Sequence, residues 1–95
     1  MPRIIHFVSR EFHIADYDIT GSRKYTPYMR ARLAVILIAR AWGHTFTQIA
    51  HSINRHHTTV SYDYDKAVQF AKENPEYRAA CERVLDRAAV ELYPS

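Results

Sequence analysis

Apolar residues recur at three- and four-residue steps along most of this chain, which is the spacing of α-helices that bury one face. The apolar positions 4, 5, 8 and 12 predict a first helix over residues 2–12, with Pro2 in its first turn. Asp16 is suited to cap a short second helix, and Gly21 should end it. The pattern therefore predicts two helices before a glycine-led loop.

The longest apolar run, residues 33–39, is apolar on every side and predicts a central helix. Thr26 is suited to cap this helix and Pro27 to begin it, and Gly43 should end it just after Trp42. We interpret Trp42 as a core anchor rather than a platform for stacking bases. The arginines at positions 30, 32 and 40 are excluded from the apolar run, so they should reach solvent or phosphate.

Residues 45–67 have the spacing of a helix, a tight turn and a second helix, which is a helix-turn-helix. Thr45 and Gln48 are three residues apart, as in a capping box that begins the first helix. Asn54 stands at the turn, where asparagine tolerates a left-handed backbone. The second helix should begin at His57, place its N-terminal residues against the major groove and persist to about residue 73.

Asn74, Pro75 and Glu76 predict the start of a final helix, with a cap, a proline in the first turn and an acid beside the helix dipole. Its apolar stripe continues down to Tyr93. Cys81 lies on that stripe, so we interpret it as a small hydrophobic residue rather than a nucleophile. The pattern as a whole predicts one all-α domain over residues 1–95, with five or six helices around a central helix-turn-helix.

Composition narrows the class of protein. An apolar share of 47% with only two glycines argues against a disordered chain. The single cysteine excludes an internal disulfide and fits a reducing compartment. No signal peptide is visible, and no apolar run reaches the ~20 residues needed to span a membrane. We therefore expect a cytoplasmic protein without a membrane partner.

Positive charge is concentrated in the middle of the chain. Residues 19–62 contain six arginine and lysine residues and no acid, whereas both flanking segments carry more acids than bases. A solvated basic face is the plain alternative, but the coincidence with a helix-turn-helix favours a surface that faces phosphate. If four to six phosphates are neutralised, log affinity should fall against log salt with a slope of about −4 to −5.

The motif Arg55-His56-His57-Thr58-Thr59-Val60 resembles the arginine-aspartate-histidine-threonine-threonine-valine signature of the C-terminal DNA-binding domain of DnaA, the bacterial replication initiator. The likeness extends back through the capping box to Ser22-Arg23-Lys24 and Arg30-Ala31-Arg32. Two positions depart from the family. His56 replaces the aspartate, and Asn54 replaces a double glycine in a turn one residue shorter. The resemblance implies a fold similar to the DnaA C-terminal and Trp-repressor-like domains.

The resemblance also implies which residues contact DNA. In the family an arginine matching Arg23 enters the minor groove, and the matching histidine and first threonine contact bases. Simple capping by His56 or Thr58, and a solvated Arg23, are the alternatives. We predict base reading by Arg23, His56, His57, Thr58 and Thr59. We predict phosphate contacts by Lys24, Arg30, Arg32, Thr45, Thr47, Arg55 and Lys66.

Rival functions fit the sequence less well. His51, His56 and His57 are close in sequence, but without a cysteine pair or a metalloprotease motif we expect no metal and no cofactor. No catalytic residues and no phosphate-binding loop are recognisable, so we expect neither a hydrolase nor an ATPase. The main alternative is a protein-interaction module that keeps the fold and binds a partner through acids near the second helix.

The resemblance implies a bacterial or phage protein that associates with the nucleoid and binds an asymmetric double-stranded DNA site as a monomer. Because the chain begins at a methionine and ends just after its last helix, we expect a free-standing domain. Such a domain would regulate transcription or replication initiation by occupying its sites.

Overall fold

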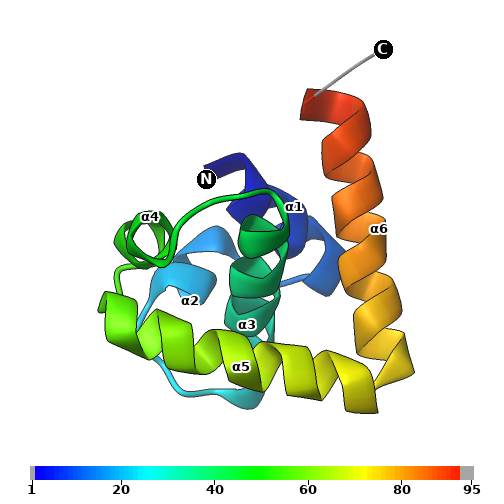
Figure 1. The fold of residues 1–95 in the computed structure, drawn as a ribbon. Coiled ribbons are helices and arrows are strands. Elements are labelled where there is room, and N and C mark those ends of the chain that lie inside the picture. Colours follow the sequence, from blue (N-terminus) through cyan, green and yellow to red (C-terminus); the bar gives the residue numbers. More distant parts are fainter. Residues whose placement is uncertain (1, 93–95) are drawn as a thin grey trace.

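The computed structural model describes residues 2–92 and places six helices in that range, with no strand (Figure 1). The helices are α1 (Pro2–Phe12), α2 (Asp16–Thr20), α3 (Thr26–Ala41), α4 (Phe46–Ser52), α5 (His57–Glu73) and α6 (Pro75–Leu92). The all-α prediction is confirmed. The predicted end of the last helix at Tyr93 lies outside the described residues.

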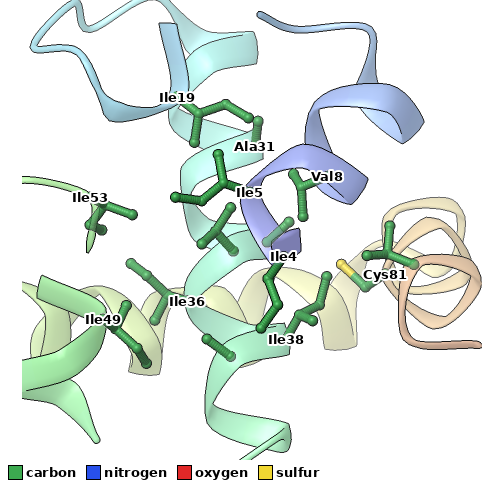
Figure 2. Packing of buried hydrophobic residues seen from close by; sticks show 14 of the residues in the cluster. Ile4, Ile5, Val8, Ile19, Ala31, Ile36, Ile38, Ile49, Ile53 and Cys81 are labelled. Atoms are coloured by element: carbon green, nitrogen blue, oxygen red, sulfur yellow. The ribbon is translucent and has the colours of Figure 1, made fainter. Parts of the chain in front are cut away.

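Helix α3 lies at the centre of the domain, and each of the other five helices packs against it. Its residues Val35, Ile36 and Ile38 are fully buried, as expected of a helix that is apolar on every side. Figure 2 shows Ile49 and Ile53, before the turn of the helix-turn-helix, on one side of α3 and Val8 with Cys81 on the other. Helix α3 is therefore the scaffold that positions α4 and α5.

Two predicted caps are wrong by one residue. The N-caps of α2 and α3 are Ala15 and Tyr25, and neither makes a side-chain cap hydrogen bond. Asp16 lies instead inside the first turn of α2, where a carboxylate still favours the helix dipole. Thr26 is the first residue of α3, and the following proline tolerates the first turn because its missing N–H would have no helical partner there.

The interpretation of Cys81 as a core residue is confirmed. Its side chain is 3% exposed between α6 and the rest of the core, and burial raises the pKa of the thiol to about 11. A thiol with a raised pKa is protonated at neutral pH and is a poor nucleophile. Trp42 is partly buried against the same core. In the described range no helix is long and apolar enough to cross a membrane.

Candidate nucleic-acid interface

Helix α4 begins with the predicted capping box. The Thr45 hydroxyl oxygen accepts from the Gln48 backbone N–H at 3.1 Å, and the Gln48 side-chain oxygen accepts from the Thr45 N–H at 2.9 Å. Each side chain satisfies a backbone donor that has no partner within the helix. This arrangement fixes where the helix-turn-helix begins.

The turn between α4 and α5 is made without glycine. Asn54 has φ of 59°, in the left-handed region that was predicted for it. The Arg55 N–H donates to the Ala50 carbonyl at 2.9 Å, and the buried Ile53 and Val60 hold the two sides of the turn against the core. One asparagine in the left-handed region therefore makes this turn.

The N-terminus of α5 presents four consecutive exposed side chains, His56, His57, Thr58 and Thr59. His56 is the N-cap: its Nδ1 accepts from the Thr58 N–H at 3.3 Å, and the Thr58 hydroxyl lies 2.6 Å from the same atom. With Nδ1 accepting, the neutral ring carries its proton on Nε2, so its free nitrogen is a hydrogen-bond donor. His56 therefore caps the helix and still presents a polar group outward.

The exposed face of α5 continues one turn further than the sequence analysis recognised. Tyr62 is 68% exposed, four residues after Thr58 and thus on the same face, and the Lys66 ammonium lies 5.6 Å from the centroid of its ring. The four-residue spacing was the signal that could have identified Tyr62. This face combines two histidines, two threonines, a tyrosine and a lysine.

The loop between α2 and α3 passes close to the turn of the helix-turn-helix (Figure 1). Its residues Ser22, Arg23 and Lys24 are exposed. The loop and the turn border a hollow of about 420 Å³ lined by Ser22, Lys24, Met29, Arg32 and Arg55. The structure thus brings Lys24 to the same hollow as Arg55, two residues before the start of α5, and Arg23 is its neighbour in the chain.

The prediction that Arg32 reaches solvent or phosphate is wrong. Arg32 is 7% exposed, and its Nε donates to the Ile19 carbonyl at 2.6 Å. Its Nη2 donates to the carbonyls of Asp18 and Gly21 at 3.1 and 3.0 Å. Burial, and then the nearby charge of Arg55, lower the pKa of the Arg32 guanidinium. These donors satisfy carbonyls at the end of α2 that have no helical partner, which explains why the charge is turned inward.

Two other predicted phosphate contacts have partners inside the protein. Arg30 is exposed, but its guanidinium lies over the Phe70 ring at 5.1 Å from the centroid, near the far end of α5 from His57. At 1.5 Å per residue the two ends are roughly 20 Å apart, so Arg30 is distant from the base-reading end. Arg55 is half-buried and donates to the carbonyls of Ile53, Asn54 and Gly21.

The remaining polar residues of α4 stay at the surface. Thr45 and Thr47 are exposed and line a hollow of about 480 Å³ together with His44, Gln48, His51 and Ser52. Residues 2–92 contain no group of three or more histidine, cysteine or acidic side chains that could hold a metal ion. The rings of His56 and His57 are neighbours, with centroids 4.5 Å apart.

Comparison with known protein families finds a match that covers the residues of this interface. A family model described as the bacterial DnaA protein helix-turn-helix matches residues 1–67, which is more than half of the 95-residue chain. The matched segment extends from α1 to the middle of α5. It includes the helix-turn-helix and the loop between α2 and α3, which we call the basic loop (residues 21–25). No curated protein matches the chain.

Proposed function

From the premise that this chain belongs to the bacterial DnaA helix-turn-helix family, we propose that it binds double-stranded DNA at specific sequences. It would act by occupying its sites, in transcription regulation or replication initiation, and without ATPase activity. The observation that carries the proposal is the exposed row His56 to Thr59 at the start of α5, beside an exposed basic loop. A helix N-terminus that projects polar side chains is the part of a helix-turn-helix that contacts base edges.

The proposed complex uses both grooves. Helix α5 enters the major groove, where His57 can donate to a guanine acceptor and the methyl groups of Thr58 and Thr59 can contact thymine. Arg23 enters the neighbouring minor groove. Phosphate contacts come from Lys24, Thr45, Thr47 and Lys66, with Arg30 toward the flank. As the resemblance to the family implies, the protein would bind an asymmetric site as a monomer.

Selection of bound duplexes from a random pool at physiological salt tests this proposal directly. We expect the protein to recover an asymmetric motif. A pool that stays random, although the protein is folded, would contradict sequence-specific binding. It would favour instead a protein-interaction module that has kept the fold.

Replacement of His57 by alanine should weaken binding to the selected site by about 1–3 kcal/mol, with a much smaller effect on random DNA. The reason is that a base contact contributes to specific binding only. His56→Asp should shift the selected motif toward the family's site, because a carboxylate accepts from cytosine where the histidine Nε2 donates. Aspartate is also an effective N-cap, so this variant keeps the start of α5 intact.

These two variants are compared with the wild type in parallel selections and in titrations on one labelled duplex. The control variant is Arg78→Gln. Arg78 is exposed on α6, pairs with Glu82 and lies outside the proposed DNA contacts. If wild type and both histidine variants recover one motif with equal affinity, α5 does not read bases through these side chains.

Replacement of Arg23 by alanine should reduce affinity and relax a preference for A·T pairs at one end of the site. Such pairs form a narrow and strongly negative minor groove, which attracts an inserted arginine. The measurement is the information content of each position in the motif selected by the variant. An unchanged motif at unchanged affinity would make Arg23 an ordinary surface cation.

A further inference from the structure

The carbonyl of Gly21, at the start of the basic loop, accepts hydrogen bonds from two arginines. One is Arg32 of α3, whose Nη2 lies 3.0 Å away, and the other is Arg55 of the helix-turn-helix. Gly21 itself has no room for a side chain, since an added Cβ would lie 2.8 Å from the Tyr17 carbonyl oxygen. The backbone at Gly21 is therefore held by Arg32, by Arg55 and by its close approach to the Tyr17 carbonyl.

Arg32 holds the loop from the inside. Besides the carbonyls of Asp18, Ile19 and Gly21, its Nη2 approaches the Arg23 carbonyl at 3.4 Å. The backbone of Arg23 is thus within reach of a buried guanidinium, while its own side chain is exposed. Arg32 determines the path of the backbone that carries Arg23.

Arg55 links the loop to the helix-turn-helix. Its Nη1 donates to the carbonyls of Ile53 and Asn54 at 3.2 and 3.1 Å, within the turn, and its Nη2 donates to Gly21, 34 residues earlier in the chain. One planar guanidinium therefore connects the turn before α5 with the loop that carries Arg23. A planar fork with five donors can make these contacts together, whereas a lysine ammonium is a single point of charge.

We propose that Arg55 is a positioning residue that fixes the loop relative to α5, so that Arg23 and His57 read two grooves at one set spacing. Arg32 supports the same loop from the core. The proposal rests on the proposed DNA binding and changes the role of Arg55 from a phosphate contact to an internal link. Because the loop is already fixed relative to α5, it need not become ordered when Arg23 and His57 contact DNA. This favours affinity and a fixed distance between the two parts of the motif.

The decisive variant is Arg55→Lys, which keeps the positive charge but removes the fork. We expect about tenfold weaker binding and loss of the preference at the Arg23 end of the motif, with the part read by α5 unchanged. In the Arg55→Lys protein, adding Arg23→Ala should weaken DNA binding by less than about a further twofold, because the loop no longer places Arg23 correctly. If Arg55 merely contacted phosphate, lysine would replace it with little loss of affinity. The effects of Arg55→Lys and Arg23→Ala on the binding free energy would then be additive.

Each arm includes a check of folding and a measurement without DNA. Thermal unfolding should show that Arg55→Lys is folded, and Arg78→Gln serves as the charge control. In the DNA-free protein, Arg55→Lys should speed amide hydrogen exchange at residues 21–25 while α6 keeps its protection. Unchanged exchange in the loop would overturn the proposal even if DNA binding fails. A wild type that selects no motif, with faster loop exchange in the variant, would refute only the DNA-binding role.

Discussion

Raising the salt concentration from 0.05 to 0.2 M should lower the affinity of this protein for its DNA site about 150-fold. Four cations that we expect at the DNA interface are exposed, and none is described as donating to carbonyls inside the protein. They are Arg23, Lys24, Arg30 and Lys66. If each neutralises one phosphate, the slope of log affinity against log salt is about −3.6. The sequence alone led to an expected slope of −4 to −5. Because Arg32 and Arg55 donate to carbonyls inside the protein, we now expect the shallower value.

Fluorescence anisotropy titrations on one duplex, at five or more salt concentrations, measure this slope. Lys24→Ala should make it shallower by about 0.9, while Arg78→Gln on α6 should leave it unchanged. A slope near zero would contradict a phosphate-facing surface. A slope of −5 or steeper would show that the two inward arginines turn toward DNA in the complex.

Replacement of Ile36 by alanine should lower the free energy of unfolding by about 2–5 kcal/mol. Ile36 is fully buried on α3, on the side that faces Ile49 and Ile53 of the helix-turn-helix (Figure 2). The loss combines the transfer energy of the removed methyl groups with the cavity that they leave. This is a large part of the ~5–15 kcal/mol that keeps a typical domain folded.

Urea denaturation followed by circular dichroism measures the effect. Ile36→Val is the graded control and should cost about 0.5–1.5 kcal/mol. Val90→Ala on α6 should cost less than about 0.5 kcal/mol, because Val90 is 70% exposed. Equal stabilities for the alanine and valine variants would mean that the core collapses around the gap, and that α3 does not hold α4 and α5 in place.

Much of the fold could be predicted from the sequence because its signals act over a few residues. The capping box of Thr45 and Gln48 and the left-handed Asn54 depend on side chains that meet backbone groups close by. The bounds of α1 and α5 followed from apolar spacing. The exposed row from His56 to Thr59 followed from the motif, and the cap formed by His56 is likewise a contact between residues two positions apart.

The roles of the arginines could not be predicted in the same way. Arg32 and Arg55 belong to an acid-free basic segment, and composition places them on a phosphate-facing surface. Arg32 donates to carbonyls 9 to 14 residues earlier in the chain. Arg55 donates to two carbonyls of the adjacent turn and to one that lies 34 residues earlier. Which way a guanidinium points depends on where unsatisfied carbonyls lie after the helices have packed.

The sequence by itself determined the helical segments, the turn and the residues at the start of α5, because local hydrogen bonds and apolar periodicity specify these. Only the tertiary structure decided which cations are available to DNA. Packing of α2 and the turn against α3 brings the Gly21 carbonyl within reach of both Arg32 and Arg55. A buried carbonyl without a donor is costly, so these two charges satisfy the backbone and leave Arg23 and Lys24 exposed.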